Sequence, residues 1–333
     1  MYSFLRGVLF LAILLAANAG EAADYATLYS PETLQNSYNT YARNLRGLWE
    51  EDLLTLLTAA ERRAAANVRL ELPLIGAHRH PFDYYASPFR RRVTVPILSV
   101  KFFDDICTAI AWMERRGCNK LAVSDYVGVI RYQDPSNLPG GRFPPPLEAF
   151  GVPGNVLQDP FVYDVSGKAL KSAIYFLMAH ELAHVMYRHK GYDRITANEA
   201  QEQEIQADAF ALNLMRRIGV PPVGMSFFFL VASRFELAPG DFETLSQYEA
   251  YLRERATHPL TSNRLTAVAD GIRRNVDSFV RGQRDPALWR SRILEMANEI
   301  QRIGQTLDDR AIRELQRYRS RTVTLGELAA ACQ

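Results

Sequence analysis

The chain has few of the features that mark nucleic-acid-binding, membrane-spanning or cysteine-rich proteins. Its 333 residues include only three cysteines, and 39 basic residues nearly balance 37 acidic ones. A nucleic-acid surface would need clustered basic residues, whereas the arginines of the C-terminal third are interleaved with acids. Beyond the N-terminus, no apolar stretch approaches the roughly 20 residues that cross a bilayer. We therefore expect no nucleic-acid partner and no membrane span in the body of the chain.

The N-terminus has the pattern of a secretory signal peptide. Arg6 precedes an apolar run, residues 7–17, which is shorter than the roughly 20 residues of a membrane span, and small residues follow it. We predict that residues 1–23 are a signal peptide, with an uncleaved membrane anchor as the alternative. Export combined with very few cysteines favours a bacterial periplasm as the location.

Export would place Cys107, Cys118 and Cys332 in an oxidising compartment, where one disulfide and one remaining thiol is the simplest outcome. Cys107 and Cys118 are the nearest pair in the sequence. On one straight helix they would lie about 16 Å apart, too far to bridge. This pairing therefore requires the chain to turn back, which Gly117 would allow.

The pattern of apolar residues predicts an α+β protein that is predominantly helical. Segment 31–67 has apolar residues at helical spacing, and helical patterns also cover 102–116 and nearly everything after Gly167. Strand character is limited to three short segments, which would form a small sheet. These segments are 68–74, 93–100 and 120–132.

A long segment between these regions, 133–160, is rich in proline and glycine and includes three consecutive prolines at 144–146. This composition predicts a long loop. Loops of such length often act as lids over a functional site. A plain surface excursion is the alternative interpretation.

One helix carries a pattern typical of metal chemistry, with His180, Glu181 and His184 in the order His-Glu-x-x-His. Residues four apart share one helix face, so both imidazoles can bind one tetrahedral Zn²⁺ at about 2.0–2.1 Å. Glu181 is then placed to act as a general base toward a water on the metal. The flanking residues are apolar, so the helix enters the core, where unpartnered polar groups are costly. A surface helix with ordinary His and Glu residues is the alternative.

A catalytic zinc needs a third protein ligand, and the next helix offers Glu199, Glu202 and Glu204. Glu204 begins the sequence Glu-Ile-Gln-Ala-Asp, which resembles the Glu-x-x-Ala-Asp element of gluzincin metallopeptidases. The likeness is greatest to the minigluzincin family of prenyl-protein endopeptidases, heat-shock membrane proteases and periplasmic outer-membrane-maintenance peptidases. By this resemblance Glu204 is the third ligand and Asp208 orients a zinc-bound histidine, which agrees with the usual carboxylate partner of such histidines. Glu199 and Glu202 would then be surface charges.

The resemblance extends over about 166–269. Phe227 to Phe229 match a Phe-rich helix, and Thr257-His258-Pro259 followed by Arg264 matches a later element of the family. By this resemblance His258 lies near the active site and stabilises an oxyanion, and Arg264 forms an ion pair with a buried acid. The alternative is that His258 is only a helix N-terminal residue before Pro259, with Thr257 or Thr261 as the cap.

Upstream the likeness weakens. Segment 121–132 is the candidate for the edge strand that binds substrate by β-augmentation, but its sequence does not match the one that the family has there. His189 lies off the metal face and is interpreted as structural. His78 and His80 form either a second metal site or, more simply, part of the surface.

Together these features predict a zinc-dependent endopeptidase that holds one Zn²⁺ per chain and cleaves unfolded or misassembled envelope proteins. Its partners would be polypeptide substrates and outer-membrane or other envelope proteins. The alternative is a weakly active, chaperone-like or peptide-binding envelope protein that keeps the zinc site while segment 133–160 plugs the cleft. The predicted regions are a signal peptide at 1–23, an N-terminal helical region at 24–92, a metallopeptidase domain at 93–270 and a C-terminal helical extension at 271–333.

Overall fold

The structure is a computed structural model that describes residues 25–77, 81–254 and 258–332. The predicted signal peptide and the histidines at 78 and 80 lie outside the described residues. Helices make up 71% of the structure beside one small three-stranded sheet, which confirms the predominantly helical α+β class. Among the described helices, none is both long and apolar enough to cross a membrane.

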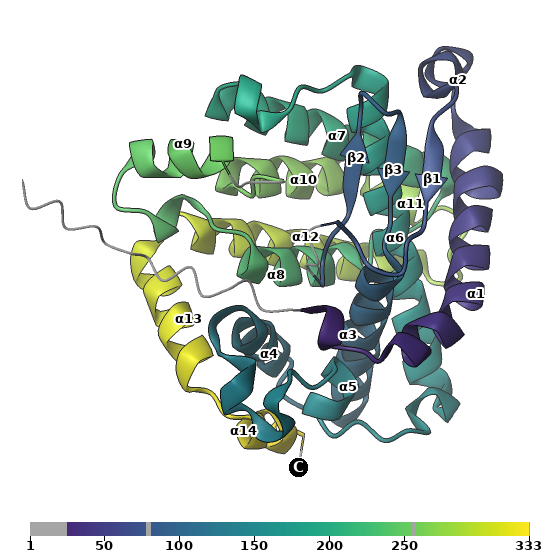
Figure 1. The fold of residues 1–333 in the computed structure, drawn as a ribbon. Helices are drawn as coiled ribbons and strands as arrows, with labels where there is room; N and C mark the ends of the chain where they lie inside the picture. The colour runs from purple at the N-terminus through teal and green to yellow at the C-terminus, as the bar shows by residue number, and fades with distance from the viewer. Residues whose placement is uncertain (1–24, 78–80, 255–257, 333) are drawn as a thin grey trace, which may run out of the picture.

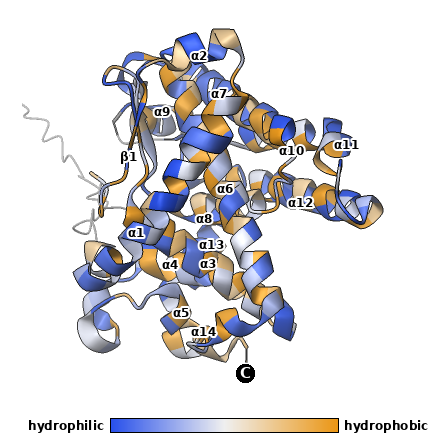
Figure 2. Ribbon diagram, turned by 90° about the vertical axis from the view of Figure 1, so that its right-hand side faces the viewer, coloured by the Kyte–Doolittle hydropathy of each residue, from blue (hydrophilic) through white to orange (hydrophobic). Residues whose placement is uncertain are grey.

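The long helix α6 (Pro160–Tyr187) runs through the centre of the molecule and packs against α3 (Ile97–Arg116) and α7 (Ala197–Ile218), as Figure 1 shows. Its start is specified locally, because Asp159 accepts hydrogen bonds from the first backbone amides and Pro160 occupies the first helical position. Every residue from 172 to 186 is buried. Figure 2 shows hydrophobic residues concentrated in these central helices, so α6 carries its polar motif through the core.

The sheet lies against α6 and has the strand order β1–β3–β2. β1 (Arg69–Glu71) runs parallel to β3 (Arg92–Thr94), whereas β2 (Tyr85–Ser87) runs antiparallel to it. Ala86 of β2 lies opposite Val93 of β3. β2 is therefore an edge strand, a role that the sequence patterns did not predict.

Two of the predicted strands are present but shorter than expected. Segment 68–74 contains β1, and 93–100 contains most of β3 before the chain turns into α3. Pro96 is the residue before the first turn of α3. Proline has no amide hydrogen for a sheet ladder, so it ends the strand at this point.

Segment 120–132, predicted as a strand or hairpin, is instead the helix α4 (Leu121–Tyr132). Its buried residues pack against α8 (Met225–Phe235) and α13 (Arg310–Thr322). Burial between two helices outweighs the β propensity of valine and isoleucine, which depends strongly on context. The prediction of a substrate-binding edge strand in this segment is therefore wrong.

Segment 133–160 folds into short helical turns rather than one long loop. Phe143 and Phe150 are buried, and the Tyr126 hydroxyl of α4 donates to the Pro144 carbonyl at 2.7 Å. The segment is thereby attached to α3 and α4. Its turns are η4 (Pro135–Asn137), η5 (Pro139–Gly141), α5 (Pro146–Ala149) and η6 (Val156–Gln158).

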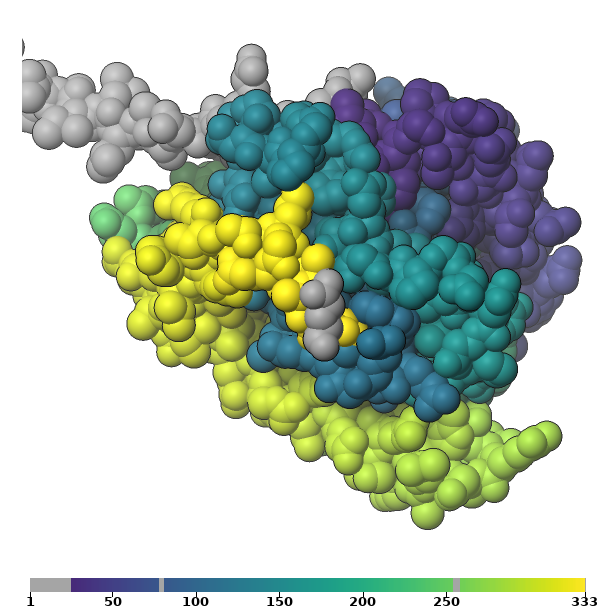
Figure 3. Space-filling view, turned by 90° about the horizontal axis from the view of Figure 1, so that it is seen from below, coloured from purple at the N-terminus to yellow at the C-terminus, as the bar shows by residue number. Residues whose placement is uncertain are grey.

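The C-terminal helices pack onto the central ones. α12 (Pro286–Leu307) contacts α8 and α10 (Ser262–Arg274), and α13 contacts α4. After α14 (Leu325–Ala330), Cys332 forms a disulfide with Cys118 at the end of α3. Figure 3 shows these C-terminal residues, in yellow, seated against the blue and teal atoms of the α3–α5 region.

This disulfide overturns the pairing of the two nearest cysteines. Cys107 lies in the middle of α3, which continues to Arg116 and ends in a left-handed turn at Gly117. Cys107 is therefore held about half the length of α3 away from Cys118 and remains a buried thiol. The correct partner is distant in sequence, and only the packing of α13 and α14 brings it near.

Replacing both Cys118 and Cys332 with serine is expected to lower the free energy of unfolding by about 2–4 kcal/mol. The bridge joins positions 214 residues apart, so its loss frees many conformations of the unfolded chain. Urea denaturation of the oxidised protein and the variant measures the difference. A reductant should shift the denaturation midpoint of the parent but not of the variant, and equal midpoints without reductant would contradict the prediction.

The remaining elements cover the core or connect its helices. They are η1 (Tyr25–Thr27), α1 (Pro31–Gly47), η2 (Leu48–Leu53), η3 (Leu54–Leu56), α2 (Ala59–Ala65), η7 (Tyr192–Arg194), η8 (Pro239–Asp241), α9 (Leu245–Glu254) and α11 (Val276–Phe279).

Candidate metal centre

The two histidines of the α6 motif point to one place in the core. His180 and His184 are both buried, and their Nε2 atoms lie 3.0 Å apart. This separation follows from the helix itself, since residues four apart stand one above the other on the same face. Two imidazole nitrogens so close together are arranged to share one ligand.

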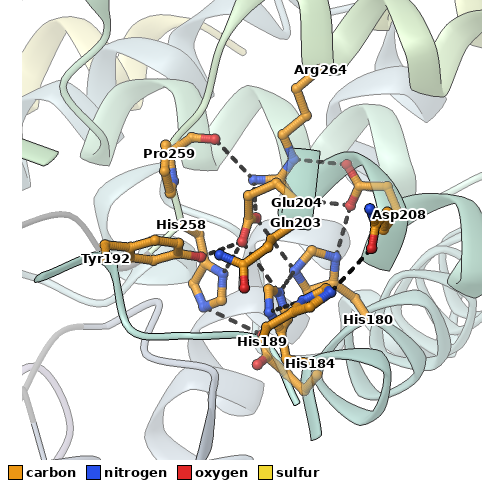
Figure 4. Close-up of polar contacts among 12 residues, drawn as sticks. His180, His184, His189, Tyr192, Gln203, Glu204, Asp208, His258, Pro259 and Arg264 are labelled. Carbon is orange, nitrogen blue, oxygen red and sulfur yellow. Dashed lines mark hydrogen bonds and ion pairs between the residues drawn. The ribbon is translucent and has the colours of Figure 1, made fainter. Parts of the chain in front are cut away.

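α7 brings a carboxylate to the same place. Glu204 lies with Oε1 at 3.2 Å from His184 Nε2 and Oε2 at 3.5 Å from His180 Nε2. The competing acids lie elsewhere: Glu199 accepts a hydrogen bond from the amide of Thr196, the cap of α7, and Glu202 is exposed. With His258, the two histidines and Glu204 form a cluster whose candidate ligand atoms all lie within 4.8 Å of one another (Figure 4).

The far nitrogens of both histidines are held by hydrogen bonds. His180 Nδ1 donates to Asp208 Oδ1 at 2.8 Å, and His184 Nδ1 lies 2.9 Å from Nδ1 of His189. Metal-binding histidines commonly use the second ring nitrogen in this way, which fixes the ring and the tautomer. The structure thus places Asp208 against His180 and His189 against His184.

A buried arginine of α10 binds both acids. Arg264 donates to the two Asp208 oxygens at 2.7 and 3.0 Å, and its Nη1 lies 2.6 Å from Glu204 Oε2. Burial alone would raise the pKa of each acid, but Arg264 and the nearby histidines hold both pKa values below the usual range. Both carboxylates are therefore ionised, which is the form that binds a cation.

His258 stands on the other side of the cluster, just before α10. Its Nε2 lies 3.4 Å from Glu181 Oε1 and 3.2 Å from the Tyr84 carbonyl. Burial lowers the pKa of His258, but the charges of Glu181 and Glu204 raise it above the ordinary value. The structure thus brings His258 to the motif helix, and Thr261 is the residue that caps α10.

One neighbour of the cluster carries no sequence signal. Tyr192, in the connection between α6 and α7, donates its hydroxyl to Glu204 Oε1. Burial, followed by the charge of Glu204, raises the pKa of Tyr192 well above its usual value, so it stays a neutral donor. A lone tyrosine in a short connection belongs to no motif, and only the return of the chain from α6 to α7 places it here.

The chemistry of these residues fits a divalent metal. Glu181 Oε2 and His258 Nδ1 are buried without a hydrogen-bond partner among the described residues. Glu204 Oε2 also accepts no hydrogen bond among the described residues, although it lies near the charged groups of Arg264 and His180. Buried polar atoms normally have partners. Two imidazoles and a carboxylate are a usual catalytic ligand set for zinc, so a metal ion would satisfy the cluster.

A cavity reaches the cluster from the side of Glu181. Most of its lining residues are aromatic or aliphatic, so it is suited to an apolar group next to the polar residues. None of the residues that line it belongs to segment 133–160. Its lining includes Tyr84, Phe176, Phe228, His180, Glu181 and His258.

A comparison with known protein families matches residues 153–219 to Peptidase U49. The matched segment contains α6 and α7, and with them the His180-Glu181-x-x-His184 motif and Glu204. The match supports peptidase activity, and it covers less than half of the chain. No curated protein and no solved structure matches the chain.

Proposed function

We propose that the chain is a zinc-dependent endopeptidase. One observation carries the proposal: the buried Glu181 carboxylate lies beside a cluster of two histidines and a glutamate and lines a cavity. A closed structural zinc site would need no acid of this kind and no adjoining space. The family match to a peptidase over the same two helices supports the same interpretation.

When bound, zinc would supply Lewis-acid polarisation of the scissile carbonyl and lower the pKa of water. His180, His184 and Glu204 are the residues that would hold it. Glu181 is the general base, because its free Oε2 can take a proton from water and pass it to the leaving amine. His258 can donate toward the developing oxyanion, because its Nδ1 has no hydrogen-bond partner among the described residues.

The edge strand β2 is the surface along which we place the substrate. Its inner side pairs with β3, and its other side is the outer edge of the sheet. An extended peptide can add to such an edge, and antiparallel pairing is the more stable arrangement. Tyr84, directly before β2, lines the cavity at Glu181, so this strand leads to the reacting groups.

The alternative of a cleft plugged by segment 133–160 has little support. That segment packs on α3 and α4 and lines no part of the cavity at Glu181. We therefore favour an accessible, catalytic centre over a chaperone-like protein with a blocked one.

We further propose an exported, periplasmic location and unfolded or misassembled envelope proteins as substrates. The disulfide between Cys118 and Cys332 supports export, since such bonds persist in oxidising compartments. The apolar run near the N-terminus points the same way. Finding the bridge reduced in protein taken directly from its native cells would contradict this location.

Measuring the zinc content of two variants shows whether His258 is a zinc ligand or acts only in catalysis. His184→Ala is expected to lose zinc on dialysis, because only one imidazole and one carboxylate remain to hold it. His258→Ala is expected to keep one zinc per chain while casein cleavage falls by about a hundredfold or more. If His258→Ala loses its zinc, the histidine is a fourth ligand and the site is closed, as in structural zinc sites.

A further inference from the structure

A second, open groove of about 810 Å³ lies between the β2–β3 turn and the connection from α6 to α7. One wall comes from the turn between β2 and β3, with Pro88, Phe89 and Arg91. The other comes from the connection between α6 and α7. That connection carries His189, which contacts His184, and Tyr192, which contacts Glu204, as Figure 4 shows. The groove and the cluster therefore share the α6–α7 connection, although none of the residues lining the groove lines the cavity at Glu181.

The groove is strongly basic. Arg91, Arg188, Lys190 and Arg194 line it, against a single carboxylate from Asp193. Within the described part of the chain, neither Arg188 nor Lys190 forms an ion pair, although the charge of Lys190 acts on Glu199. These two cations are available to an anionic partner.

The backbone at Arg188 supports a role for its side chain. Arg188 ends α6 in the left-handed conformation, with φ of 56°, where glycine is the usual residue. Arg91 also has a positive φ, of 51°, but its guanidinium binds the Ala64 and Ala66 carbonyls and so serves the fold. The side chain of Arg188 makes no such bond with another described residue. Glycine could end the helix in the same conformation, so the fold does not require an arginine side chain here.

The edge strand β2 connects the two recesses. Tyr84 lines the cavity at Glu181 and Pro88 lines the basic groove, so β2 spans the distance between them. Four residues of extended chain cover about 13 Å. A substrate that pairs antiparallel to β2 would run from the groove toward the cavity. Its residues on the N-terminal side of the cleaved bond would then lie among the cations.

We propose that this basic groove binds an acidic segment of the polypeptide substrate, on the N-terminal side of the cleaved bond. Charge complementarity selects this occupant, because the groove carries four cationic side chains and one acid. The exposed Phe89 offers an apolar contact beside them. The inference rests on the proposed function for its geometry, and it goes further by naming the class of substrate that is preferred.

Two labelled peptides test this. They share the residues around the cleaved bond and differ in three residues beginning about four positions before it, Asp-Glu-Asp in one and Asn-Gln-Asn in the other. Fluorescence anisotropy with the zinc-loaded Glu181→Gln variant gives the dissociation constants without cleavage. We expect the acidic peptide to bind about tenfold more tightly at low ionic strength, and this advantage to fall to about twofold near 0.5 M salt.

A matched pair of double variants, each made in the Glu181→Gln background, assigns the effect to the groove. Arg188→Gly with Lys190→Gln removes two cations and places the preferred residue at the left-handed position, so the fold is kept. With this variant, the acidic peptide should bind only about twofold more tightly than the neutral one. Arg292→Gln with Arg302→Gln removes two exposed arginines of α12, which does not line the groove, and should keep the full advantage.

Equal binding of the two peptides would overturn the inference, as would an advantage that survives in the groove variant. An advantage only for acids placed after the cleaved bond would also overturn it. These outcomes are distinct from failure of the proposed function. If the protein with Glu181 intact cleaves neither peptide while the acidic one still binds more tightly, the endopeptidase proposal fails and the acidic docking site stands.

Discussion

Replacing Glu181 with glutamine is expected to lower the cleavage of an unfolded protein such as casein by about a thousandfold. Glutamine has nearly the shape of glutamate, so the buried side chain should still fit beside His258 and the cavity. It cannot accept a proton, and the hydrolysis then lacks both its base and the donor to the leaving amine. Zinc content should be unchanged, because Glu181 is outside the cluster of candidate ligands.

The measurement compares casein cleavage rates of protein and variant at equal zinc content. Glu202→Gln is a matched control, because it makes the same change at an exposed position of α7. Its rate should stay within about twofold of the parent. A Glu181→Gln protein that cleaves at the parental rate would remove Glu181 from the mechanism. Cleavage by neither parent nor variant, with zinc bound in both, would contradict the peptidase proposal itself.

Replacing Arg264 with methionine is expected to lower the free energy of unfolding of the metal-free protein by about 3–5 kcal/mol. Arg264 is buried and is the cation that lies against both Asp208 and Glu204. Methionine fills a similar volume but leaves two buried carboxylates without that charge. Burial disfavours the ionised form of each acid, and the charge of Arg264 is the main interaction that offsets this cost.

Urea denaturation with and without zinc measures this effect. The loss should be smaller with zinc bound, because the metal returns positive charge to Glu204. Arg310→Met is the matched control: Arg310 is exposed and pairs with Glu314, and such surface pairs contribute less than about 1 kcal/mol. A loss at Arg264 no larger than at Arg310 would show that the buried ion pairs contribute little to stability.

Some features of the protein follow from local sequence alone. The spacing of His180 and His184 places them on one helix face whatever surrounds the helix, because the geometry of an α-helix is fixed over one turn. The start of α6 is equally local, with its aspartate cap and first-turn proline. Helix-rich composition after Gly167 predicted the helical character of that region.

Glu204 and Asp208 were less accessible to local reasoning. The physics of a helix allowed three acids as the third ligand, and a family resemblance selected one of them. The structure brings Glu204 to the histidines because α6 and α7 pack side by side, with Tyr192 in the short connection between them. The contact between Tyr192 and Glu204 could not be predicted, since the sequence does not show which path the chain takes from α6 to α7.

The sequence by itself determined the motif helix, the predominantly helical class and the residues able to hold a metal. Only the tertiary structure decided which segments join them. Segment 120–132 is a helix because it is buried between α8 and α13. Cys118 bonds to Cys332 because the packing of the C-terminal helices places the end of the chain next to the end of α3. β2 became the edge strand, and the basic groove formed at its end. These outcomes depend on burial and on contacts between distant residues, whereas periodicity and spacing report only the conformation of neighbours.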